Sequence, residues 1–421
     1  MNEKRGGISG AMTKMWHGLL VWALGGGLCC AQTFDIHGAS EVLPSEYDSD
    51  WVFIGSSLVD VVDNIFKGVI GVSNGGMGSS FTFSPDNRYM FAVERFYSRG
   101  NRGERTEMVT VFDTSKLSAV DEIIIPSKSA MIGSIDGATA LSDENRFLAV
   151  FNLTPATSLT IVDTEARKFV GEISTPGCSL VYAAGERRYV MLCTNGGLLT
   201  VTLDEDGNEL SKVRTAGYFD PEVDPITEAG VRYGDQWLFV SFDGMVYPLD
   251  VSGAAPRFKD TWSLLTDEDR LDNWRIAGNQ HLTVHQGTGR LYSLVRQSED
   301  PLDDPGDMDG TEIWVYDIES HQRVRRFEAV PQRDSEKGNI WRTLVRFVTG
   351  NVADDEGANG GTGGIGSTSG DGASGILVTQ GDDPVLVTVG GGVSVRNVIT
   401  GEYIHERLKN VPQSGRLTPR N

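Results

Sequence analysis

Short runs of apolar and β-branched residues recur along the chain, and most of them end at an Asp followed by a polar turn. The clearest run covers residues 108–113 and stops at Asp113 and Thr114. β-Branched residues favour strands, and Asp and Thr side chains bond turn amides, so each run predicts a strand followed by a turn. The runs of this kind are 58–63, 109–113, 159–163, 198–204, 246–250, 313–317 and, in degraded form, 393–397.

A second pattern interleaves with the first and consists of a polar turn, an Arg, an aromatic residue or Leu, and an apolar run. It occurs at 84–93, 142–150, 185–192 and 287–294. Further short runs follow the first pattern at 68–72, 121–125, 169–173, 324–327 and 403–407. Two hairpins per roughly 50 residues make a four-stranded unit, which buries both faces when such units stack around an axis. The sequence therefore predicts an all-β fold, a seven-bladed β-propeller.

The domain plan that follows has three parts. Residues 1–31 are predicted to be a signal peptide, 32–50 an irregular arm, and 51–421 a single propeller domain. Within the propeller, residues 350–375 are rich in Gly, Ser and Asp and have almost nothing to bury, so we expect a disordered insertion in the last blade.

The first residues have the composition of an export signal. Lys4, Arg5 and Lys14 precede an apolar stretch over 15–28, and Cys29-Cys30-Ala31 offers small residues for cleavage before Gln32. The stretch is short and Gly-rich for a membrane span of about 20 residues. Lipidation of Cys29 is the alternative, although Leu28 before it fits that pattern poorly. We expect a periplasmic protein that does not span the membrane.

Net charge narrows the choice of partners. The chain carries −21, and because residues 1–31 carry +2, the exported chain would carry −23. Such a charge argues against nucleic acid or an anionic membrane as a partner. It is compatible with cationic small molecules or a basic protein surface, and also with a surface that is merely solvated.

Cys178 and Cys193 are the cysteines left after export. They lie on two predicted strands joined by a turn, and an oxidising compartment favours pairing. We expect a disulfide across this hairpin, with a contribution of roughly 3 kcal/mol from closing a loop of about 15 residues.

The residues alone contain no self-contained catalytic set. His281 and His285 flank a strand-like run, which would place them about 13 Å apart, too far for one metal ion. No Gly-x-Ser-x-Gly sequence and no phosphate-binding loop before a helix is present. A propeller of this kind is often a scaffold or one subunit of an enzyme.

Four features in order along the chain are characteristic together. The first is Gly75-Gly76, and the second is Arg102, Gly103, Glu104, Arg105 and Thr106, followed by Val-Phe-Asp113. The third is the pair Cys178 and Cys193, and the fourth is the stretch 265–280, which contains Trp274, Arg275, Gly278 and Gln280, with His285 beyond it. Together they resemble the heavy chain of methylamine dehydrogenase and aromatic amine dehydrogenase, and the two cysteines lie about where that family has a heavy-chain disulfide. The resemblance covers residues 55–330 and partly returns at 376–411.

The resemblance implies a seven-bladed subunit of a periplasmic quinoprotein amine dehydrogenase. In that family two heavy chains pair with two small, cysteine-rich light chains as a heterotetramer. The light chain carries tryptophan tryptophylquinone, which oxidises a primary amine to an aldehyde and ammonia. Electrons then pass to a periplasmic copper protein or a cytochrome. The heavy chain itself supplies a scaffold and part of the substrate channel, with no catalytic residue, cofactor or metal of its own.

Some positions depart from the family pattern. Met77 stands where methylamine-specific heavy chains have an aromatic residue at the channel mouth, and Ile276-Ala277 follow Trp274-Arg275 in place of Pro-Gly. Met is flexible, so it would shape the entrance differently; packing within a blade is the alternative role. Two other functions remain open: a heavy-chain-like propeller that acts as a periplasmic binding or assembly module, and a lactonase-type propeller, for which no metal-binding motif is found.

Overall fold

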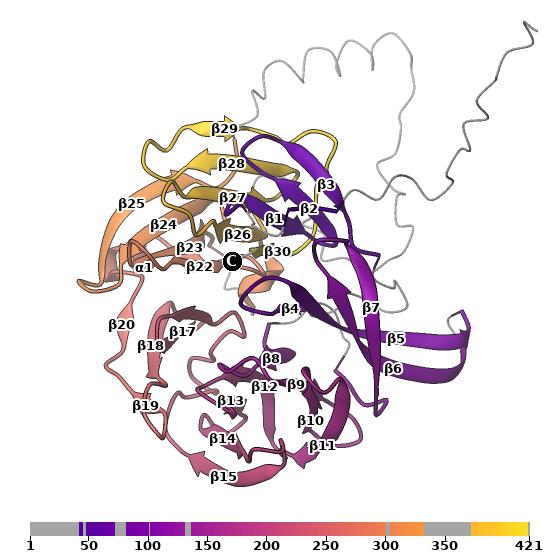
Figure 1. Ribbon diagram of the computed structural model, residues 1–421. Helices are drawn as coiled ribbons and strands as arrows, with labels where there is room; N and C mark the ends of the chain where they lie inside the picture. The colour runs from indigo at the N-terminus through magenta and orange to yellow at the C-terminus, as the bar shows by residue number, and fades with distance from the viewer. Residues whose placement is uncertain are drawn as a thin grey trace, which may run out of the picture. The chain divides into compact units, whose positions relative to one another are not determined.

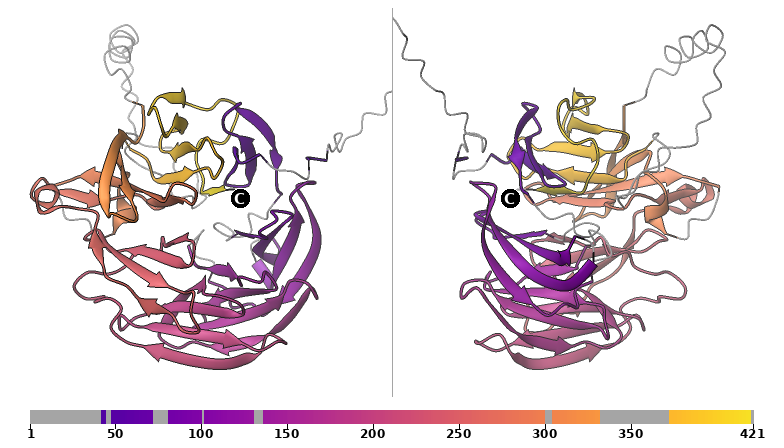
Figure 2. Two further views of the ribbon diagram at one scale, coloured as in Figure 1. Left: turned by 60° about the vertical axis from the view of Figure 1, so that its left-hand side comes forward. Right: turned by 90° about the vertical axis from the view of Figure 1, so that its right-hand side faces the viewer.

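The computed structural model describes residues 42–44, 48–71, 81–100, 102–130, 136–299, 304–331 and 372–419. Contacts divide the chain into two units, residues 1–42 and 43–421, and the second contains the whole propeller. Seven antiparallel sheets are arranged in a ring, as predicted (Figure 1, and from two further sides in Figure 2). We number them as blades 1 to 7 in chain order.

Blades 1 to 4 take up the first half of the propeller. Blade 1 contains β1 (Trp51–Ile54), β2 (Ser57–Asp60), β3 (Ile65–Val69) and β30 (Leu417–Pro419). Blade 2 contains β4 (Phe81–Phe83), β5 (Tyr89–Arg99), β6 (Arg102–Asp113) and β7 (Ser118–Ile125). Blade 3 contains β8 (Thr139–Leu141), β9 (Phe147–Asn152), β10 (Ser158–Asp163) and β11 (Lys168–Ser174). Blade 4 contains β12 (Cys178–Ala183), β13 (Arg188–Cys193), β14 (Leu198–Leu203) and β15 (Glu209–Thr215).

Blades 5 and 6 have five strands each, and blade 7 has four. Blade 5 contains β16 (Val231–Tyr233), β17 (Gln236–Val240), β18 (Met245–Asp250), β19 (Arg257–Phe258) and β20 (Trp262–Ser263). Blade 6 contains β21 (Trp274–Ile276), β22 (Leu282–His285), β23 (Arg290–Gln297), β24 (Glu312–Asp317) and β25 (Gln322–Glu328). Blade 7 contains β26 (Gly375–Val378), β27 (Val385–Val389), β28 (Val393–Asn397) and β29 (Tyr403–His405). Helix α1 (Asp267–Leu271) precedes blade 6, and the 3₁₀ turn η1 (Pro305–Asp307) follows β23.

The core lies between the blades. Seven clusters of buried apolar side chains occupy the seven interfaces, and each draws its residues from two neighbouring sheets. In blade 2, for example, Val109 and Val111 pack toward blade 3, whereas Met90 and Phe112 pack toward blade 1. Alternate residues of one strand point to opposite faces, so each sheet supplies two interfaces. The stacking argument made from the repeat is therefore confirmed.

The C-terminal strand closes the ring, which the repeat pattern did not predict. β30 pairs with β1, with Phe53 opposite Thr418 and Ile54 opposite Leu417. The two ends of the propeller thus share blade 1, and the ring cannot open without breaking this sheet.

Several predicted boundaries differ from those of the structure, and two of them affect the blades directly. β2 ends at Asp60 rather than at residue 63, since residues 61–64 form the turn. Residues 350–371 of the predicted insertion lie outside the described residues. Its last four residues, 372–375, are described and belong to the fold. Ala373 is buried and exchanges two backbone hydrogen bonds of 2.8 Å with Gly310. A Cβ on Gly372 would lie 2.7 Å from the Gly310 carbonyl oxygen, so the small residues here serve close packing.

Candidate functional site

Residues 102–106 lie at the start of β6, in a hairpin with β5 that is longer than the rest of blade 2 (Figure 1). The sequence predicts a strand only over residues 108–113, but β6 begins at Arg102. β7 pairs with β6 only from Glu107 onward, and β4 pairs with β5 only as far as Ala92. Residues 95–100 and 102–106 therefore form a two-stranded ribbon, called the ribbon from here on.

The fold accounts for part of this motif. Gly103 has a φ of 98°, and a Cβ there would lie 2.3 Å from Ser98 Oγ. The backbone N–H of Glu104 donates to the same Ser98 Oγ at 3.0 Å. Arg105 forms an ion pair with Glu107. Arg102 and Glu104 are exposed, and within the described ranges their side chains take part in no hydrogen bond or ion pair.

Trp274 and Arg275 lie on β21, in blade 6. The Trp274 ring is 5.0 Å from the fully buried ring of Trp314, and the Arg326 guanidinium lies 4.9 Å from both rings. Arg323 covers Trp314 at 3.9 Å. Cations over indole faces are favourable contacts. Trp274 is therefore part of the packing of blade 6, and Arg275 is only partly buried.

Asp269 lies in helix α1 and connects this helix to the cluster around Trp314 through Arg323. Its Oδ2 accepts from the Thr266 backbone N–H and hydroxyl, both at 2.8 Å, and from Arg323 at 2.8 Å. Burial alone would raise the pKa of Asp269, but the hydrogen bonds from Arg323 and Thr266 outweigh it and lower the pKa. The pair Thr266 and Asp269 forms a capping box, which explains why the helix begins there.

Gly278 packs closely within blade 6, and Gln280 connects blade 6 to the closing strand β30 of blade 1. Gly278 has a φ of 101°, and a Cβ there would lie 2.9 Å from Leu294 Cδ1. The Gln280 side chain donates to the Leu417 carbonyl at 2.7 Å and accepts from the Leu417 N–H at 3.0 Å. Gln280 thus holds the closing strand β30, a role that sequence alone did not indicate.

The predicted disulfide between Cys178 and Cys193 is present in blade 4. The two residues are directly opposite each other on β12 and β13, with their Cα atoms 3.9 Å apart. Arg214 lies beside the bridge, with Nη1 3.0 Å from Cys178 Sγ. The bridge joins neighbouring strands of one blade and is buried.

Two adjoining cavities of about 570 and 670 Å³ occupy the axis of the propeller. Inner strands β4, β8, β12, β16, β22 and β26 supply their walls. Five residues line both cavities: Asp136, Gly230, Arg232, Trp237 and Arg416. The part of the axis where the two cavities meet is therefore lined by the charged side chains of Asp136, Arg232 and Arg416.

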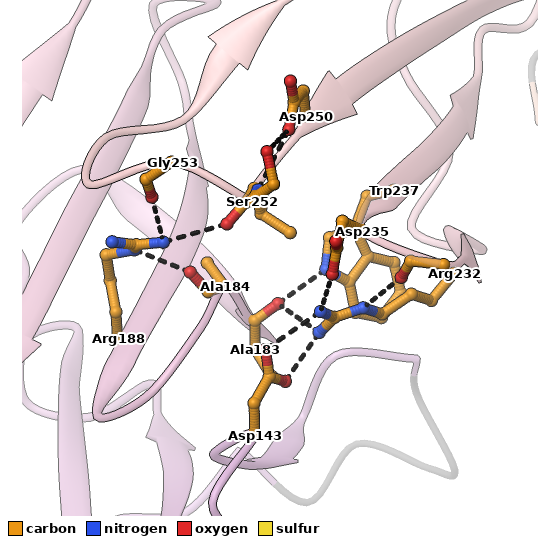
Figure 3. A network of polar contacts seen from close by, with 12 residues as sticks. Asp143, Ala183, Ala184, Arg188, Arg232, Asp235, Trp237, Asp250, Ser252 and Gly253 are labelled. Carbon is orange, nitrogen blue, oxygen red and sulfur yellow. Dashed lines mark hydrogen bonds and ion pairs between the residues drawn. The ribbon is translucent and has the colours of Figure 1, made fainter.

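Arg232 lies in the wall of both cavities and is held by hydrogen bonds to two other blades (Figure 3). Its guanidinium donates to both carboxylate oxygens of Asp143, at 2.7 and 2.9 Å, and to the Ala183 carbonyl at 3.2 Å. Trp237 Nε1 donates to the same carbonyl at 2.6 Å. Close by, Arg188 donates to the carbonyls of Val251 and Gly253 at 2.9 and 2.6 Å. These contacts connect blades 3, 4 and 5. Asp143 compensates the charge of Arg232, whereas Arg188 is held by backbone carbonyls.

Arg416 provides the second charge at the axis. It precedes β30 and forms an ion pair with Asp136, which precedes β8. Burial lowers the pKa of Arg416 to about 10. Since each axial arginine has an aspartate partner, the described lining leaves no uncompensated charge for a ligand.

The predicted site residues are not brought together. Residues 102–106 belong to blade 2, the cysteines to blade 4 and Trp274 to blade 6. Met77, Gly75 and Gly76 lie outside the described residues, so the channel role of Met77 stays a prediction. His281 bonds Thr227 and the Gly278 carbonyl, and His285 bonds Thr288 and the Gly381 carbonyl. In the described parts of the chain no group of three or more His, Cys, Asp or Glu could hold a metal ion.

The described helices are all too short to cross a membrane.

Among solved structures, the dihydro-heme d1 dehydrogenase NirN is similar in fold, with a TM-score of 0.51 and 14% identity over 89% of this chain and 76% of that one. A functionally unknown protein from Desulfotomaculum acetoxidans gives a TM-score of 0.50 at 9% identity, over 88% of this chain and 98% of that one. At these identities the likeness concerns the fold alone.

Curated sequences give a closer relationship. The methylamine dehydrogenase heavy chain of Methylophilus methylotrophus is 22% identical over 273 residues, 65% of this chain and 67% of that protein. The one from Paracoccus versutus is 25% identical over 279 residues, 65% of this chain and 64% of that protein. The family model for the methylamine dehydrogenase heavy chain matches residues 49–337, well over half of the sequence. The chain therefore belongs to the methylamine dehydrogenase heavy chain family.

Proposed function

We propose that this chain is the heavy subunit of a periplasmic quinoprotein amine dehydrogenase. The enzyme would oxidise a primary amine to an aldehyde and ammonia and pass the electrons to a copper protein or a cytochrome. The observation that carries the proposal is the family match, which begins at residue 49 and extends through blades 1 to 6.

The tryptophans that the structure describes support placing the quinone on a partner. Tryptophan tryptophylquinone, when present, supplies the group that accepts electrons from the amine. Trp274 and Trp314 are the tryptophan pair in ring contact among the described residues. Trp314 is fully buried and covered by Arg323, which leaves a substrate no access to it. The pair does not fit a reactive quinone, in keeping with a light chain that carries the cofactor.

The role proposed for the heavy chain is to hold the light chain and to form part of the substrate channel. A ring closed by β30 and packed at all seven interfaces is a rigid platform. Met77 is proposed to line the channel mouth.

Reconstitution tests this function. The chain would be produced with a small, cysteine-rich light chain of this family, and amine-dependent reduction of an electron acceptor would be measured. We expect activity from the complex and none from the chain alone. A chain that binds no such subunit, or a complex inactive with every primary amine, would favour the alternative of a binding or assembly module.

A further inference from the structure

The ribbon extends beyond the sheet that supports it. In Figure 1, β5 and β6 continue past the end of β7. Phe96 is opposite Thr106 and Tyr97 opposite Arg105, but neither edge of this part pairs with β4 or β7. A two-stranded hairpin is marginally stable in water on its own. The ribbon therefore adds no strand pairing to the sheet of blade 2 beyond that between β5 and β6.

The base of the ribbon is held firmly. Glu107 is completely buried and forms ion pairs with Arg105 and with Arg95, the latter at 3.3 Å. Its other carboxylate oxygen accepts from the Ser129 backbone N–H at 3.0 Å, on the connection to blade 3. Ser127 Oγ donates to the Arg105 carbonyl at 3.3 Å. These contacts fix the direction in which the ribbon leaves the propeller.

The tip, in contrast, presents exposed side chains to solvent. Phe96 is 39% exposed, and Arg99, Arg102 and Glu104 are exposed. Aromatic residues and arginine are the types most enriched in protein interfaces. Arg99 and Arg102 outnumber Glu104, so the tip is basic on a chain whose net charge is −21. Such a tip is attracted to a carboxylate-bearing surface.

We infer that the ribbon is a docking element for the light chain, with Phe96 as its apolar anchor and Arg99 and Arg102 facing carboxylates of the partner. The inference rests on the proposed function, since it is the family that implies a light chain. It also accounts for the motif at 102–106: Gly103 and Arg105 shape and anchor the ribbon, whereas Arg102 and Glu104 are left free for a partner.

The test compares matched charge reversals. The double variant Arg99→Glu/Arg102→Glu alters the tip, and Lys168→Glu/Lys259→Glu makes the same charge change at exposed positions of blades 3 and 5. Binding of each purified chain to a cysteine-rich light chain of this family would be measured at about 0.05 and about 0.5 M salt. The variant Phe96→Ser tests the apolar anchor separately. Melting temperatures would show that every variant is folded, as expected for exposed substitutions.

We expect the tip reversal to weaken binding by about 10- to 100-fold at low salt and by less at high salt, because the lost attraction is electrostatic. Phe96→Ser should weaken binding by about 10-fold or more at both salt concentrations. The control pair should change binding by less than about 3-fold. Amide exchange of residues 96–104 should slow in the wild-type complex.

Each failure has a different meaning. Wild-type binding with tip variants that behave like the control pair would overturn the docking inference and leave the proposed function intact. Absence of binding by the wild-type chain would overturn the proposed function and the docking inference with it.

Discussion

Replacing Glu107 by Ala should destabilise the propeller more than any exposed change on the same ribbon. Glu107 is completely buried, pairs with Arg95 and Arg105, and accepts from the Ser129 N–H. Removing one partner of a buried ion pair costs about 3–5 kcal/mol. The two arginine side chains are 16% and 28% exposed, so both can turn toward water and recover part of this cost. The unpaired Ser129 N–H adds about 1–3 kcal/mol. We expect a net loss of about 2–4 kcal/mol in the free energy of unfolding.

Urea unfolding followed by tryptophan fluorescence measures this loss. Glu107→Gln keeps an acceptor for the Ser129 N–H and should lose about 1 kcal/mol. Glu104→Ala, at an exposed position of the ribbon, should stay within about 0.5 kcal/mol of the wild type. If Glu107→Ala unfolded at the same urea concentration as Glu104→Ala, the ribbon would not be anchored as described.

Four further predictions concern other parts of the chain. The variant Cys178→Ser/Cys193→Ser should lose roughly 3 kcal/mol of stability and keep its fold by circular dichroism; labelling of both thiols in the native wild type would contradict this. Gly278→Ala should lower the free energy of unfolding by about 2–4 kcal/mol, because the new Cβ meets Leu294 and the backbone there is left-handed. Gly253→Ala has no such clash and serves as the control. Equal melting temperatures for the two variants would refute this reasoning. Burial and the nearby carboxylates of Asp48 and Asp60 raise the pKa of Asp50 to about 6. Asp50→Asn should therefore stabilise the protein increasingly as the pH rises through 6 and have no effect below about pH 4. An equal effect at pH 4 and pH 8 in thermal melts would argue against this. Met77→Phe should lower kcat/KM for bulky arylalkylamines by about 10- to 100-fold and spare methylamine, whereas equal effects on both amines would indicate a packing role.

The repeat predicted most of the fold because period-two patterns and Asp turns are local signals. Runs ending at Asp113, Asp163 and Asp317 match the ends of β6, β10 and β24. Closure of the ring was not predictable, because the short β30 has no signal until it is placed beside Phe53. The ribbon was missed because Arg, Gly and Glu at 102–104 do not favour a strand, and cross-strand pairing with β5 decides their conformation.

The candidate site was less predictable than the fold. Cys178 and Cys193 could be paired from their positions on one hairpin. Arg416 and Asp136 meet at the axis although they are far apart in sequence, so no spacing rule could join them. Gln280 had a place in a motif, but its contact with Leu417 depends on the ring being closed.

The most direct measurement begins by producing this chain together with a cysteine-rich light chain of its family. The subunit composition of the purified protein is then determined, and its visible absorbance is recorded before and after a primary amine is added. We expect a stable complex of this chain and the light chain, whose quinone absorbance is bleached by the amine. A chain that purifies without the small subunit, or a complex whose absorbance no amine changes, would contradict it.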